Sequence, residues 1–142
     1  MVLVLCSCGR QPQPAPRYEY EVIGVEQQAL EAIEHMPTEF HVEFQDDEAV
    51  WDRGHLFFRT YTRAGSYEEN FDYPSPGTTL RSKEGGDDLY TYEIERSQVS
   101  GGYRYLVHCS PRRQTALQCA RNAKNIARFL RDGHLELSLL HR

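Results

Sequence analysis

Two neighbouring segments in which side chains alternate strictly in character constrain the fold of this chain more than any other feature. Residues 89–96 (LYTYEIER) and 103–109 (YRYLVHC) place large apolar and polar residues at alternate positions, which is the period of a strand with one buried face. The connector contains Gly101 and Gly102, so we predict an antiparallel hairpin. One face of it is expected to carry a buried cross-strand ladder of Tyr90, Tyr92, Tyr103 and Tyr105.

Two longer segments carry apolar residues at helical spacing. Residues 46–63 open with Asp46 and Asp47, which are favourable N-caps, and contain Gly54 on the apolar face, where we expect a neighbouring element to approach closely. Residues 114–133 end in a glycine suited to a helix C-terminus. The buried stripe of this second helix is predicted to contain Leu117, Ala120, Ala123, Ile126, Ala127 and Leu130.

The remaining elements give the order strand, helices, a run of strands and then a helix. This order differs from the regular βαβ alternation of a parallel sheet. Strands are expected at 18–25, 38–45, 67–74, 78–82 and 134–140, and a short helix at 26–36. The fold class predicted is therefore α+β, with an antiparallel sheet of about four to five strands and two main helices packed on one face.

Size and charge fit one folded domain. The chain has 142 residues and a formal net charge of −5, and no apolar stretch approaches the roughly 20 residues needed to span a bilayer. The charge is uneven, because residues 1–98 hold 19 acidic and 8 basic residues, whereas residues 99–142 hold 2 and 8. We interpret this as internal complementarity or, alternatively, as a surface for an anionic partner.

The N-terminal stretch LCSC resembles the end of the signal of bacterial lipoproteins. In that family a Leu stands three residues before the modified Cys and a small residue directly before it, and Leu5, Ser7 and Cys8 match this pattern. The resemblance implies cleavage after Ser7 and a lipid on Cys8, which would give a signal remnant at 1–7. Residues 8–16 are rich in Pro and Gln and are expected to form an extended tether, followed by a single domain at 17–142.

The leader departs from that family because it is short and lacks Lys and Arg. We therefore expect translation to start upstream of Met1. The alternative is a cytosolic N-terminal tail in which Cys6 and Cys8 form a metal or redox site, although a lone CxC supplies only two of the four ligands that structural zinc requires.

The other two cysteines are predicted to form a disulfide. Cys109 ends a predicted strand and Cys119 lies in the helix that follows, and a helix packed back on its own strand could bring them within bonding reach. Such a bond requires an oxidising compartment, which is also what the lipoprotein resemblance implies. The alternative is a pair of buried free thiols.

Histidine and carboxylate patterns do not match a known metal or catalytic motif. His35, Glu39, His41 and Glu43 cluster in sequence, and Asp52 precedes His55 by three residues, but neither group reads HExxH. We predict no metal site, with His35, His41 and His55 as the nearest candidates. GxSxG, GxGxxG and the P-loop are also missing, so we expect no cofactor and, on balance, no catalysis.

Four cations lie at spacings of 3, 4 and 3 along one face of the C-terminal helix: Arg121, Lys124, Arg128 and Arg131. They form either an ordinary solvated face or a surface for an anionic partner, such as an envelope polyanion or protein. Aromatic residues are not interleaved with them, which argues against nucleic acid.

The leading hypothesis is an exported, lipid-anchored domain with a binding or scaffolding role at the bacterial cell envelope, meeting the membrane only through its N-terminal lipid. One alternative is a small soluble hydrolase or metal-binding enzyme with a His/Glu site. The other is a cytosolic adaptor that uses the basic C-terminal helix.

Overall fold

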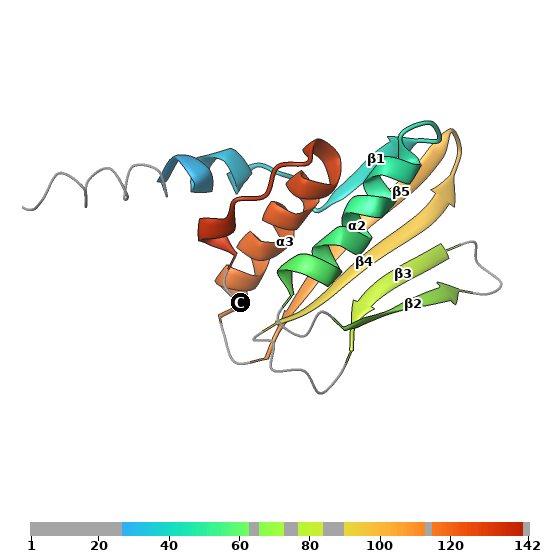
Figure 1. The fold of residues 1–142 in the computed structure, drawn as a ribbon. Coiled ribbons are helices and arrows are strands. Elements are labelled where there is room, and N and C mark those ends of the chain that lie inside the picture. Colours follow the sequence, from blue (N-terminus) through green and yellow to red (C-terminus); the bar gives the residue numbers. More distant parts are fainter. Residues whose placement is uncertain (1–26, 63–65, 73–76, 84–89, 113–114, 141–142) are drawn as a thin grey trace, which may run out of the picture.

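An antiparallel sheet forms one layer of the molecule and helices form the other (Figure 1). The computed structural model describes residues 27–62, 66–72, 77–83, 90–112 and 115–140. Its 5-stranded sheet has the order β1-β5-β4-β3-β2. The strands are β1 (Glu39–Glu43), β2 (Tyr67–Asp72), β3 (Gly77–Ser82), β4 (Tyr90–Val99) and β5 (Gly102–Pro111). The last four strands follow one another as a meander, and β1 closes the sheet beside β5.

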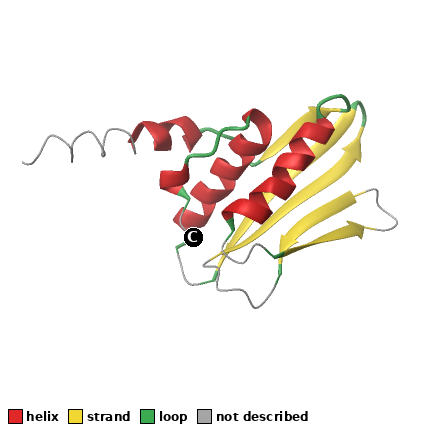
Figure 2. Ribbon diagram, in the orientation of Figure 1, coloured by secondary structure: helices red, strands yellow, loops and turns green. Residues whose placement is uncertain are grey.

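Two helices cover one face of this sheet, as the sequence predicted (Figure 2). They are α2 (Asp47–Tyr61) and α3 (Ala116–Asp132), which pack against each other as well as against the strands. A further helix at residues 27–34 and the short 3-10 helix η1 (Leu137–Leu139) lie on the side of α3 that faces away from α2. The α+β prediction is confirmed, while the strand predicted at 18–25 lies outside the described residues.

The β4–β5 hairpin turns at Gly101 and meets β1 at Gly102. Gly101 has φ 81°, a left-handed conformation that glycine adopts without a steric penalty. Gly102 pairs with Val99 in the hairpin and with Glu43 of β1. A Cβ atom at Gly102 would lie 2.0 Å from the carbonyl oxygen of Val42, so the close approach of β1 requires a glycine there.

The hairpin register shows that the predicted tyrosine ladder is wrong in its pairing. Tyr92 lies opposite Cys109, whereas Tyr105 lies opposite Arg96. The tyrosines therefore share the helix-facing side of the sheet but occupy opposite ends of the hairpin. Tyr90, Tyr92 and Tyr105 are buried in the core, so their predicted role in core packing is confirmed.

Gly54 lies at the point where α2, the sheet and α3 meet. A Cβ atom built at this glycine would be 3.2 Å from Cδ1 of Leu80, with side chains of Ile94 and Leu130 within 4 Å. The predicted close approach is confirmed, and it brings the central part of α2 directly onto the core.

The first turn of α2 is fixed to the sheet by a buried carboxylate rather than by an N-cap side chain. Asp46 occupies the N-cap position without a capping hydrogen bond. Tyr105 instead donates a hydrogen bond of 2.7 Å to Oδ1 of Asp47, and Arg96 lies 3.2 Å from Oδ2. The Arg96 guanidinium also lies 4.3 Å from the Trp51 ring centroid, so one half-buried cation joins the helix to the strands.

Helix α3 is buried on more sides than the sequence predicted. Ala123, Ile126, Ala127 and Leu130 of the predicted stripe are buried, but Leu117 is 62% exposed and Ala120 is also exposed. Asn122 and Asn125 are fully buried instead. Asn122 donates to the Tyr92 hydroxyl, while Asn125 bonds both the carbonyl and the amide of Glu136.

The C-terminal segment turns back along α3 and does not form the strand predicted at 134–140. Within it, η1 buries Leu139 against Ala29 and Ile33 of the first described helix. Its backbone is held by Asn125 and by Gln118, which donates to the Leu139 carbonyl. These side chains satisfy backbone groups of the segment that strand pairing would otherwise have to satisfy, so the segment does not need to join the sheet.

Candidate functional site

Cys109 of β5 and Cys119 of α3 lie at disulfide-bonding distance, as predicted. Their Cα atoms are 5.4 Å apart, within the range that a disulfide spans. Cys119 is buried, and α3 packs directly on β5, so the elements themselves bring the two residues together.

The three histidines nearest to a metal motif lie on different elements. His35 follows the helix at 27–34 and is almost fully exposed. His41 lies on β1, whereas His55 lies on α2, with Nδ1 2.7 Å from the Tyr67 hydroxyl and Nε2 3.8 Å from a Glu69 oxygen. The structure therefore does not bring His35, His41 and His55 together.

A polar face of the sheet points away from α2 and α3. The alternation of β1, β4 and β5 turns its charged residues to this side: Glu39, His41, Glu43, Glu93, Glu95, Arg104 and His108. Ion pairs connect neighbouring strands across it. Arg81 of β3 pairs with Glu93, His108 lies 3.4 Å from Glu95, and Arg104 lies 4.0 Å from Glu39.

Glu93, Glu95 and His108 form a close group of ionisable side chains on this face. One ligand atom from each lies within 4.8 Å of the others. Burial raises the pKa of the Glu95 carboxyl above its ordinary value, and its hydrogen bond with Glu93 raises it further. We call these three residues the β4–β5 cluster; among the described residues it is the group whose geometry could hold a metal ion.

Sequence reasoning missed the β4–β5 cluster because strand alternation specifies a face but not the partner across the hairpin. Glu93 lies directly opposite His108 only in the register that pairs Val99 with Gly102. The sequence feature that could have identified the cluster is the tight turn at Gly101. Counting residues outward from this turn along both strands gives the register.

The four cations of α3 have different surroundings. Lys124 donates a 2.6 Å hydrogen bond to the carbonyl of Glu34, and Arg128 lies 3.6 Å from a carboxylate oxygen of Glu136. Arg131 contacts the Met36 sulfur and lies over the Phe40 ring. Arg121 instead lines an open groove. Three of the four therefore hold other parts of the chain against α3.

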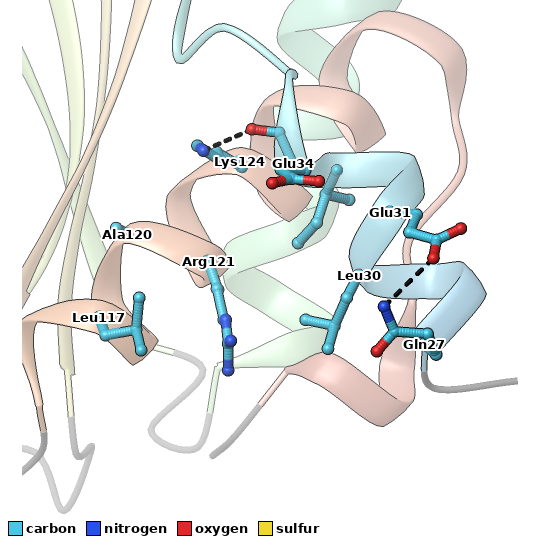
Figure 3. A pocket seen from close by; sticks show the side chains of 9 residues that line it. Gln27, Leu30, Glu31, Glu34, Leu117, Ala120, Arg121 and Lys124 are labelled. Atoms are coloured by element: carbon cyan, nitrogen blue, oxygen red, sulfur yellow. Dashed lines mark hydrogen bonds between the residues drawn. The ribbon is translucent and has the colours of Figure 1, made fainter. Parts of the chain in front are cut away.

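This groove runs between the helix at 27–34 and α3 (Figure 3) and has a volume of about 400 Å³. The first wall contributes Gln27, Leu30, Glu31, Ile33 and Glu34, and the second Leu117, Ala120, Arg121 and Lys124. Leu30 and Arg121 line it from the two helices, and the exposed Leu117 lies at one end. The groove thus combines apolar surface with charges of both signs.

Cys8, the predicted tether and the signal remnant lie outside the described residues. Among the helices in the described part of the chain, none has the length and apolar character needed to cross a membrane.

No protein-family model, curated protein or solved structure matches this chain.

Proposed function

We propose that this chain is an exported bacterial protein, anchored to the cell envelope by a lipid on Cys8, with a binding or scaffolding role and no catalytic activity. The observation that carries the proposal is the position of Cys109 and Cys119. The fold brings these cysteines within disulfide distance across the β5–α3 contact. Cytosolic thiols are kept reduced, so a pair held in this way supports an oxidising compartment.

The lipid anchor would leave the domain in water near a membrane. A chain extends by at most about 3.5 Å per residue, so the segment between Cys8 and Gln27 would hold the described domain within about 65 Å of the bilayer. The sequence GRQPQPAP at 9–16 suits such a spacer because its prolines favour extended backbone. A single acyl chain binds membranes only marginally, whereas the multiple chains of a lipoprotein anchor hold firmly.

The binding surface proposed is the groove between the helix at 27–34 and α3. Its exposed apolar residue, Leu117, lies near the cationic Arg121. This combination suits a segment of an envelope protein that presents an apolar side chain beside a carboxylate. Lys124 already bonds the Glu34 carbonyl, so Arg121 is the cation we assign to a partner.

The test is the intact mass of protein made in a bacterial host from coding DNA that includes the region upstream of Met1. We expect a chain that begins at a lipid-modified Cys8 and gains two hydrogen atoms on reduction. A Cys8→Ala variant should lose the lipid and leave the membrane fraction. The matched control is Cys6→Ala, which alters the neighbouring cysteine and should retain both.

An unmodified and fully reduced chain would contradict the proposal. That result would favour the cytosolic adaptor, whose binding to an acidic partner should depend on salt and on Arg121. A lipid-modified chain in which Cys109 and Cys119 stay reduced would support the lipid anchor. It would contradict the use of this cysteine pair as a sign of an oxidising compartment.

A further inference from the structure

The β4–β5 cluster has the composition and spacing of a metal site. Glu93 and Glu95 lie two residues apart on one strand and therefore point to the same side of the sheet, and His108 lies directly across from Glu93. Two carboxylates and one imidazole are thus held together on the uncovered face by backbone register. This group shares no residue with the groove or with the proposed lipid site, so its role goes beyond the proposed function.

Its distances require little adjustment to hold an ion. Ligand atoms about 2.0–2.2 Å from a tetrahedral zinc ion lie about 3.3 Å from one another. Nε2 of His108 and Oε1 of Glu95 are already 3.4 Å apart, and all three ligand atoms lie within 4.8 Å of one another.

The surroundings hold the ligands in place. Strand β4 lies between β3 and β5, so both sides of its backbone are paired near Glu93. Arg81 of β3 donates to Oε2 of Glu93, which orients the carboxylate. Hydrogen bonds of this kind orient ligating carboxylates in metalloproteins.

Charge in this region also favours a cation. Three acidic groups, Glu93, Glu68 and Glu95, interact electrostatically with Arg81. Arg81 and Arg104 offset part of their charge, and His108 does so only when it is protonated. A divalent ion bound to neutral imidazole would compensate the two carboxylates more fully.

We propose that Glu93, Glu95 and His108 bind a divalent transition-metal ion and that Zn²⁺ is the ion best suited to them. Mixed imidazole and carboxylate ligands are typical of zinc, whereas calcium and magnesium prefer oxygen alone. Three protein ligands leave at least one coordination position open for water or for a group of another molecule. The two glutamates and the histidine are the ligands, and Arg81 is a positioning residue.

The test is calorimetric titration of the full chain with Zn²⁺ after treatment with a chelator. We expect one ion per chain, and an increase in unfolding temperature with added zinc. His108→Ala should abolish this binding and Glu95→Gln should weaken it strongly. Arg81→Gln should weaken it by about 10–100-fold, the usual effect of removing a residue that orients a ligand. Because all three side chains lie on the outer face, the variants should keep the wild-type circular dichroism.

Matched controls separate this site from other zinc ligands in the chain. His134→Ala removes a histidine that also contacts a glutamate, Glu136, and should bind zinc as the wild type does. The double variant Cys6→Ser, Cys8→Ser should also retain one site, since the N-terminal thiols are not part of it. Zinc binding that survives in His108→Ala, or that is missing from the wild type, would overturn the proposal. Neither result depends on whether Cys8 is lipidated.

Discussion

The phenol of Tyr105 donates a hydrogen bond of 2.7 Å to the carboxylate of Asp47, and this bond joins the first turn of α2 to the middle of β5. Both residues are buried. Tyr105→Phe should therefore lower the free energy of unfolding by about 1–3 kcal/mol, because it leaves a buried carboxylate with one fewer donor. Urea denaturation measures the change. Tyr103→Phe is the control, since Tyr103 is only partly buried, and an equal loss in both variants would contradict the assignment.

The same bond predicts a loss of stability in alkali. Burial and the Asp47 carboxylate raise the pKa of Tyr105 above its ordinary value of 10.0. A pKa that is raised in the folded state gives stability that is fully present below pH 10 and is lost as pH rises beyond it. Wild-type protein should therefore lose stability above pH 10 more steeply than Tyr105→Phe. Denaturant midpoints across this range test it, and parallel curves for the two proteins would exclude Tyr105 as the source.

Replacing Gly102 should displace β1. The Cβ atom of Gly102→Ala would lie 2.0 Å from the carbonyl oxygen of Val42, and backbone cannot yield as a side chain can. We expect a destabilisation of about 1–3 kcal/mol, as for other forced contacts in packed regions. Hydrogen exchange should show faster exchange in β1 than in β3. The turn variant Ser100→Ala, at an exposed position, should change stability by less than about 0.5 kcal/mol.

Reduction of the cysteine pair should weaken the contact between β5 and α3. Removing a cross-link across 10 residues of sequence should lower the free energy of unfolding by about 2.5–3 kcal/mol in the chain-entropy model. The measurement is urea denaturation of the oxidised protein with and without reductant. Cys6→Ser, Cys8→Ser should respond to reductant as the wild type does. A transition that reductant leaves unchanged would mean that the thiols are free in the purified protein.

The cations of α3 should separate into structural and exposed classes. Arg128 is half-buried beside Glu136, so Arg128→Glu should place two carboxylates together and destabilise the fold by more than about 1 kcal/mol. Arg121→Glu, on the groove wall, should change stability by less than about 0.5 kcal/mol. Thermal unfolding compares the two. Equal effects would contradict this division, and the expected result makes Arg121→Glu the suitable variant for studies of partner binding.

Alternation and helical spacing predicted most of the architecture because they report which face of an element is buried. The β4–β5 hairpin, the amphipathic character of α2 and the close approach at Gly54 follow from local residue patterns. The faces of α3 were harder to predict. Its cations resemble a solvated face, but the segments at 27–34 and 134–140 cover part of it, and residues distant in sequence determine that cover.

The pairing of individual residues could not be read from alternation alone. A two-residue slip along the hairpin would keep Tyr92 and Tyr105 on the same face while changing the residue opposite each of them, and Glu93 would no longer lie opposite His108. Cys109 and Cys119 were easier to pair, because a helix that follows its own strand has few ways to pack back on it. The sequence thus predicted that Cys109 and Cys119 lie close together, but it did not predict that Glu93 lies opposite His108.

Strand β5 has 10 residues whereas β1 has 5, and their pairing ends at Leu106 opposite Glu39. Strand β4 pairs with β5 along its whole length, whereas β1 pairs only with its first half. The second half, which contains Cys109, is held by β4 and by the packing of α3, where Cys119 lies. In mechanical terms, an oxidised pair would carry a pull on the end of α3 into the centre of the sheet. After reduction, the same pull would act only on the noncovalent contacts between α3 and β5. The redox state of the two cysteines would therefore set how strongly this end of the domain resists mechanical force.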